Sequence, residues 1–78
     1  MESMIKGYIR ELLSKPDLQL ENNTPLSESG IIDSLSLLKL SLFLEQKFGF
    51  AVGVEELVPE NFKSIDAICA YVRSKQKP

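Results

Sequence analysis

Apolar side chains recur at helical spacing in three stretches of the chain, and no stretch alternates regularly between apolar and polar positions. The first stretch spans residues 2–14 and places four apolar side chains on one helical face: Ile5, Ile9, Leu12 and Leu13. The second spans residues 34–49. The third follows Ser64 and carries one apolar face: Ile65, Ile68, Cys69 and Val72. The spacing therefore predicts three helices.

Residues that begin or end helices stand at the limits of these stretches. Pro16 ends the first helix, because the residue before a proline is pushed out of the helical conformation. Asp33 is a favoured N-cap for the second helix, and Gly49 stands just past its last apolar residue, where a terminating glycine belongs. Ser64 is a favoured N-cap for the last helix.

Two connections separate these helices. Residues 15–33 hold turn and cap formers, yet apolar side chains recur among them: Leu18, Leu20, Leu26, Ile31 and Ile32. We expect this long loop to be ordered and packed on the core. Residues 55–57 predict one helical turn before Pro59. The fold class that follows is an all-α bundle of three longer helices and one short helix, forming a single domain over residues 1–78.

The second helix carries two apolar stripes on nearly opposite faces. One stripe suits the core and is expected to pack on the first and last helices: Leu37, Leu40, Leu44 and Phe48. The other stripe consists of Leu35, Leu38 and Leu42. A small domain cannot bury both stripes in one core, so two interpretations are open. Either the long loop or the short helix covers the second stripe, or part of it stays exposed for a partner or a bound apolar group.

Composition excludes several classes of function. The 78 residues include no His and one Cys, which excludes an internal disulfide framework, a Cys/His zinc site and a Ser-His nucleophile pair. Cys69 lies in an apolar helical pattern, so we expect a buried free thiol. Nine basic against eleven acidic side chains argue against nucleic-acid binding. The sequence shows no signal-peptide pattern and no long apolar run, so we expect a cytoplasmic protein without membrane association.

Ser34 is a candidate site for an anionic modification. It occupies the first position of the second helix, where the backbone N–H groups and the helix dipole favour negative charge. A phosphate ester on Ser34 would therefore be stabilised, and Leu35 and Leu38 would lie nearby. Taken alone, Asp33-Ser34 at a helix start more commonly reflects capping chemistry.

Three blocks of the sequence resemble the acyl carrier protein family, and together they cover nearly the whole chain. Residues 30–35, Gly-Ile-Ile-Asp-Ser-Leu, resemble the attachment motif of the family. Residues 44–49, Leu-Glu-Gln-Lys-Phe-Gly, resemble the end of its second helix. Residues 59–65, followed by Ala67-Ile68 and Tyr71-Val72, resemble the approach to its final helix and that helix itself.

The resemblance implies a four-helix bundle that catalyses nothing itself. A phosphopantetheinyl transferase would move 4′-phosphopantetheine from coenzyme A onto Ser34, and the arm would hold acyl groups as thioesters for enzymes of fatty-acid, polyketide or other specialised biosynthesis. Asp33 would form part of what the transferase recognises, and Leu35 would belong to the attachment motif. The partner or cargo contacts would be Leu35, Leu38, Lys39 and Leu42. No metal is implied, and a monomer is expected.

The charge of the second helix departs from the family pattern. Typical fatty-acid carriers have an acidic second helix, whereas this one has only Glu45 against Lys39 and Lys47. We therefore expect a dedicated carrier of a specialised pathway, since like charges at a docking surface reduce affinity and association rate. Two alternatives stay open: an aminoacyl or peptidyl carrier loaded by an adenylating enzyme, and an unmodified helical interaction module.

Overall fold

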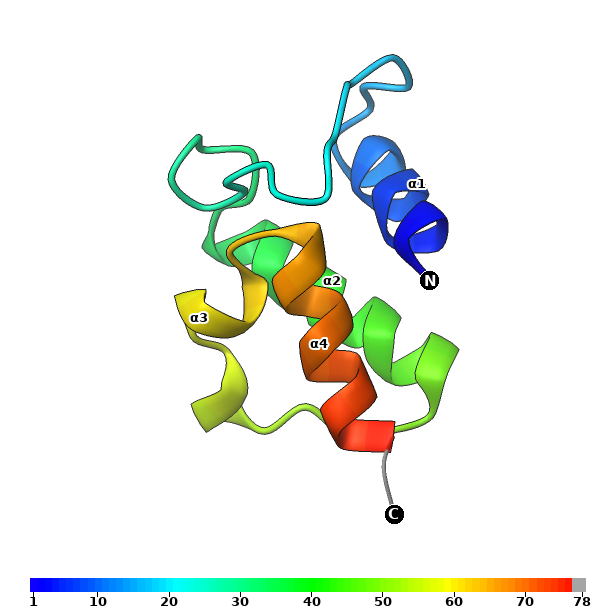
Figure 1. Cartoon of the computed structure of the whole chain (residues 1–78), viewed down its shortest axis with the longest axis vertical. Helices are drawn as coiled ribbons and strands as arrows, with labels where there is room; N and C mark the ends of the chain where they lie inside the picture. The colour runs from blue at the N-terminus through cyan, green and yellow to red at the C-terminus, as the bar shows by residue number, and fades with distance from the viewer. Residues whose placement is uncertain (77–78) are drawn as a thin grey trace.

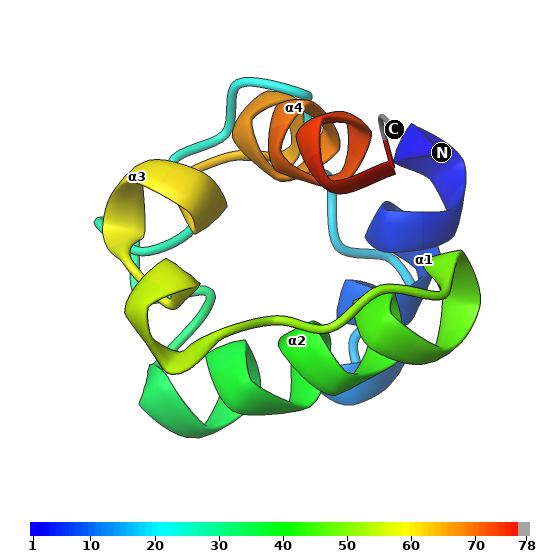
Figure 2. The ribbon, with the colours of Figure 1, turned by 90° about the horizontal axis from the view of Figure 1, so that it is seen from below.

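The chain folds into four α-helices. The structure, a computed structural model, describes residues 1–76. Its helices are α1 (Glu2–Leu12), α2 (Ser34–Phe48), α3 (Pro59–Phe62) and α4 (Ile65–Gln76), and a 3₁₀ turn, η1 (Val54–Glu56), precedes α3 (Figure 1). Helix α4 contacts each of the other three α-helices. Seen from below, α2 and α4 lie on opposite sides of the bundle, with α1 and α3 at its two ends (Figure 2). The expected all-α bundle with three longer helices is confirmed.

The ends of α2 and α4 confirm three of the predicted caps. The side chain of Asp33 accepts a hydrogen bond from the Ser36 backbone N–H. Gly49 ends α2 in the left-handed conformation, with φ of 72°, and its N–H donates to the Glu45 carbonyl. The Ser64 hydroxyl accepts from the Ala67 N–H at the start of α4.

Helix α1 ends earlier than predicted. The sequence pattern extended it to residue 14, but its last helical residue is Leu12 and Ser14 has a φ of 55°. The Ser14 N–H donates to the Glu11 carbonyl and the Lys15 N–H to the Arg10 carbonyl, so local hydrogen bonds close the helix before Pro16 acts.

The short helix lies further along the chain than predicted. Residues 55–57 were expected to form a helical turn before Pro59, and a 3₁₀ turn does occupy Val54–Glu56. The short α-helix itself begins at Pro59. Proline is favourable at the first helical position, because the N–H that it lacks would have no partner inside the helix. Pro59 therefore starts the short α-helix, which follows the predicted turn rather than coinciding with it.

The core draws on every helix and on the long loop. Its buried residues are Ile5, Ile9, Leu20, Leu26, Ile32, Leu40, Leu44, Phe62, Ile65, Ile68, Cys69, Tyr71 and Val72. Leu37 and Phe48 are only partly buried beside it. Cys69 is a buried free thiol, as expected, and burial raises its pKa.

The long loop is ordered and packed against the core, as the recurring apolar residues predicted. Two backbone hydrogen bonds attach it to the junction of α3 and α4: the Leu26 N–H donates to the Lys63 carbonyl, and the Asp66 N–H donates to the Asn22 carbonyl. The start of α2 is therefore held against the start of α4.

Truncating Leu44 and Leu42 separately tests the division of α2 into a buried and an exposed face. We expect Leu44→Ala to reduce the free energy of unfolding by about 3 kcal/mol, because it leaves a cavity at a fully buried site. Leu42→Ala, on the exposed face of the same helix, should change the free energy of unfolding by less than about 0.5 kcal/mol. Urea unfolding followed by circular dichroism measures both, and equal losses would contradict this assignment of faces.

Candidate functional site

Ser34 lies exposed at the first position of α2. The chain reaches it through Gly30, which has a left-handed φ of 79°, and then through Ile32, which is buried. The Ile32 N–H donates to the Leu26 carbonyl at 3.0 Å. Ile32 therefore anchors the segment, and the chain turns outward again at Asp33, so that the Ser34 side chain is presented on the surface.

Asp33 is the N-cap of α2, directly before Ser34. Its backbone is extended, and its Oδ1 atom accepts from the Ser36 N–H at 2.8 Å. Hydrogen bonding from Ser36, chiefly from its backbone N–H, holds the pKa of Asp33 below its usual range. The side chain is therefore an ionised cap at neutral pH.

The second apolar stripe of α2 is exposed over its whole length. The exposed fractions are 61% for Leu35, 48% for Leu38 and 51% for Leu42. Neither the long loop nor α3 covers these side chains, so the interpretation that leaves them accessible is confirmed. We call these three residues the apolar strip. It begins at the residue after Ser34, so anything attached to Ser34 starts beside it.

The exposed charge on α2 is positive. Lys39 and Lys47 are exposed, and within residues 1–76 neither belongs to an ion pair. Glu45 is the only acidic residue of α2, and its Oε2 atom accepts from the Val52 N–H at 2.7 Å. Because Glu45 is half-buried and bonded to the loop after α2, it compensates the lysine charges only in part.

Two contacts on α1 and α2 were not predicted from the sequence. The rings of Tyr8 and Phe43 stack with their centroids 4.0 Å apart, and the Tyr8 hydroxyl donates to the Lys39 carbonyl at 3.1 Å. On a helical projection of residues 34–48, Phe43 lies between Lys39 and Lys47, apart from both apolar stripes. An aromatic residue isolated in this way is the signal in the sequence that could have indicated this packing.

A second acidic side chain, Glu56, was also missed. Its Oε1 atom accepts from the Gly53 N–H at 2.9 Å and from the Tyr71 hydroxyl at 3.0 Å, and its Oε2 atom accepts from Lys75 Nζ at 3.0 Å. The Gly53 N–H first, and then the Lys75 ammonium, hold the pKa of Glu56 below its usual range. Glu56 therefore ties η1 to α4. No pattern in the sequence indicated these partners.

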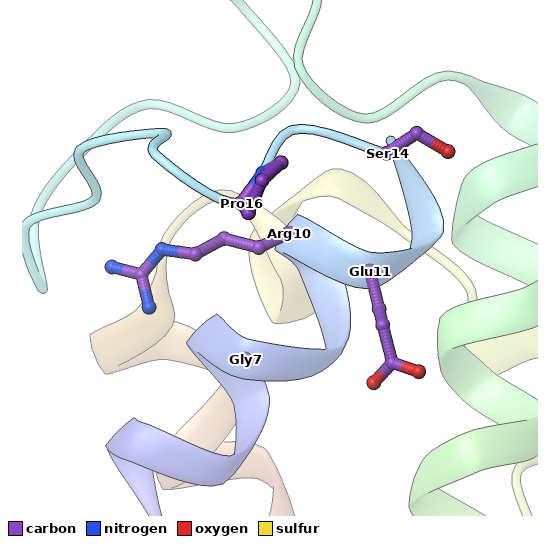
Figure 3. Close-up of a pocket in the computed structure, with 5 residues that line it drawn as sticks. All are labelled: Gly7, Arg10, Glu11, Ser14 and Pro16. Atoms are coloured by element: carbon purple, nitrogen blue, oxygen red, sulfur yellow. The ribbon is translucent and has the colours of Figure 1, made fainter.

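A pocket beside α1 lies outside this site. It has a volume of about 500 Å³ and is lined by Gly7, Arg10, Glu11, Ser14 and Pro16 (Figure 3). Arg10 is half-buried, and its side chain donates to the Leu18 carbonyl at 2.8 Å. None of the lining residues comes from α2, which carries both Ser34 and the apolar strip.

No metal site or membrane span was found in the described part of the chain. Residues 1–76 hold no group of three or more His, Cys, Asp or Glu side chains placed to bind a metal ion. No helix among them is both long enough and apolar enough to cross a bilayer.

Comparison with known proteins gives one family and several relatives. The family model described as the phosphopantetheine attachment site matches residues 4–72. A probable acyl carrier protein, PigG, of Serratia sp. (strain ATCC 39006) is 35% identical over 54 residues, which is 69% of this chain and 62% of PigG. The match therefore spans less than two thirds of PigG.

Two further relatives align along nearly their whole length. The D-alanyl carrier protein of Abiotrophia defectiva is 25% identical over 96% of this chain and 95% of its own. The acyl carrier protein of Chlamydia caviae is 26% identical over 97% of this chain and 96% of its own. Among solved structures, a chain of a crystal structure described as that of an FAD-dependent dehydrogenase is 34% identical, with a TM-score of 0.76 over 86% of this chain and 96% of that chain.

Substitutions of Asp33 test its role as the cap. We expect Asp33→Ala to lower the melting temperature and Asp33→Asn to retain most of it, because asparagine keeps an acceptor for the Ser36 N–H. Since the folded state lowers the pKa of Asp33 from its usual 3.8, the stabilisation by its charge is present above that pH and is lost as pH falls through the lowered pKa. The difference between wild type and Asp33→Asn should therefore shrink in acid. Thermal unfolding from pH 7 to pH 2 measures both effects, and equal melting temperatures for wild type and Asp33→Ala at pH 7 would contradict the role.

Proposed function

Since this chain belongs to the acyl carrier protein family of phosphopantetheine-dependent carriers, we propose that Ser34 is its attachment residue and that residues 1–78 act as one carrier domain. The observation that carries the proposal is the exposed hydroxyl of Ser34 at the start of α2, inside the segment that the family model matches. Carriers of this family are generally non-catalytic, and we propose that this chain likewise supplies no catalytic residue.

The residues around Ser34 fit a phosphodiester. Helix α2 has no acidic residue in its first turn, and its N-terminal N–H groups and dipole favour an anion. The nearest carboxylate, Asp33, is engaged with the Ser36 N–H. When bound, 4′-phosphopantetheine supplies the thiol that holds a cargo as a thioester. Ser34 fixes the point from which that arm extends, and the apolar strip gives partner enzymes a surface beside it.

The proposed partners follow from this chemistry. A phosphopantetheinyl transferase would join Ser34 Oγ to the phosphorus of coenzyme A that bears the pantetheine, and 3′,5′-adenosine diphosphate would leave. Acyl- or aminoacyl-activating enzymes and acyl-transferring enzymes would then meet the exposed face of α2. We propose that the protein is a monomer, because partner enzymes must reach Ser34. We also propose that it works in the cytoplasm.

A mass measurement tests the assignment of Ser34. Incubation with coenzyme A and a broad-specificity phosphopantetheinyl transferase should add one phosphopantetheinyl group to the wild type and none to Ser34→Ala. A gain of mass by Ser34→Ala would place the attachment elsewhere. A folded wild type that gains nothing from an active transferase would favour the unmodified interaction module.

We further propose that this carrier serves a specialised pathway rather than general fatty-acid synthesis. The support comes from α2, where Lys39 and Lys47 are exposed while Glu45 is bonded to the loop. Enzymes that select an acidic second helix would meet like charge there, which lowers affinity and association rate.

Reversing the two lysine charges tests this proposal. Lys39→Glu combined with Lys47→Glu should raise kcat/KM with enzymes of fatty-acid synthesis about tenfold, because it replaces repulsion by attraction. A matched control, Lys15→Glu combined with Lys63→Glu, makes the same change in net charge at exposed positions outside α2 and should have little effect. If the wild type serves these enzymes as well as the α2 variant does, the proposal is wrong.

An aminoacyl cargo is the second candidate. It is favoured by the similarity to the D-alanyl carrier protein, which extends over 96% of this chain. The similarity to a chain from the FAD-dependent dehydrogenase structure adds a candidate partner, and we propose offering the loaded carrier to enzymes of that class as well as to adenylating enzymes.

A further inference from the structure

The interior beneath α2 is filled by side chains. Leu40 and Leu44 project into the core from α2, and Phe62, Ile65 and Ile68 meet them from α3 and α4. All five side chains have no exposed surface. A long acyl chain entering this space would have to displace close-packed groups, and small changes of volume are already costly in a packed core.

The segment between α2 and α3 is tied to α2 and α4 by hydrogen bonds. Glu56 receives hydrogen bonds from Gly53 and from both Tyr71 and Lys75 of α4, and Glu45 receives one from Val52. The Tyr71 ring also packs against Phe50 and Phe62, with ring centroids 5.8 and 5.5 Å away. Moving the segment between α2 and α3 away from α4 would break several of these contacts together.

Two pockets of the described residues, and the apolar strip, lie away from this interior. The pocket of Figure 3 is lined from α1 and the loop after it, and a second pocket of about 260 Å³ is lined by Asn23, Pro25, Glu28, Lys63 and Ser64. Neither has a lining residue from α2, η1 or α4. The apolar side chains next to Ser34 are those of the strip, and they face outward.

We propose that the cargo of this carrier stays outside the helical bundle and is therefore compact: an aminoacyl group or a short acyl group. This inference rests on the proposed attachment at Ser34. Each methylene left in water carries an unfavourable hydration free energy, and the strip can cover only one side of a chain that lies on it. A compact or charged cargo has little apolar surface that must be removed from water. It therefore suits a carrier whose helical bundle does not bury the cargo.

Carriers loaded with a long or a short acyl group test this proposal. Octanoyl-coenzyme A or acetyl-coenzyme A and a broad-specificity phosphopantetheinyl transferase would load Ser34, with intact mass confirming each product and Ser34→Ala as the blank. Hydroxylamine cleavage of both thioesters is then timed, and octanoyl- and acetyl-pantetheine free in solution correct for the intrinsic reactivity of each acyl group. Methyl chemical shifts of Leu40, Leu44, Ile65 and Ile68 report on the core.

The outcomes separate this inference from the function on which it rests. If the cargo stays outside, the ratio of octanoyl to acetyl cleavage rates on the carrier should match that of the free thioesters within about threefold. The four core methyl signals should also be the same in both loaded forms. A larger protection of the octanoyl thioester, or octanoyl-specific shifts of these core signals, would overturn the inference. Failure of both coenzyme A derivatives to add mass would count instead against attachment at Ser34.

Discussion

The burial of Ile32 determines where the chemistry of this chain is presented. This side chain enters the core directly before the exposed Asp33, its N–H donates to the Leu26 carbonyl, and the Leu26 N–H donates to the Lys63 carbonyl. The chain is thus fixed two residues before Ser34. Asp33 can then begin α2 at a defined point, and the Ser34 hydroxyl is placed by the core rather than by a free loop. A functional residue on a short exposed segment needs such a support if its position is to be reproducible.

Packing against the core also divides α2 into a buried face and an exposed face. Leu40 and Leu44 are buried, and once they are buried the geometry of the helix turns Leu35, Leu38 and Leu42 to the surface. The exposure of the strip is therefore a consequence of how the helix packs, and the domain is too small to cover it. If Ser34 is the attachment residue, as proposed, the strip beside it can offer partner enzymes an apolar surface without any rearrangement.

Local rules predicted the attachment segment and the main helices, because those features depend on residues close together in the chain. Asp33, Gly49 and Ser64 each act within three or four residues, so their identities sufficed. The resemblance supplied the proposed role of Ser34, which capping chemistry alone left open. The contacts that the sequence could not indicate join distant positions: Tyr8 with Phe43, and Glu56 with Tyr71 and Lys75. The short helix at Pro59 was not predicted for another reason, since proline both ends and begins helices and only its neighbours decide which.

The exposed Lys39 lies at the edge of the apolar strip and affects what can associate with it. Three exposed leucines on one face would favour association of identical copies if nothing opposed it. In a two-fold dimer through this face, the same patch meets itself, so Lys39, which follows Leu38 at the edge of the strip, would approach Lys39 of the other copy. Like charges brought together in this way raise the free energy of the dimer, whereas a partner enzyme with carboxylates around an apolar surface would gain from both features. Under the proposed function, the positive charge of Lys39 at the edge of the strip would therefore act, by the same physical means, against self-association and against enzymes that select an acidic second helix.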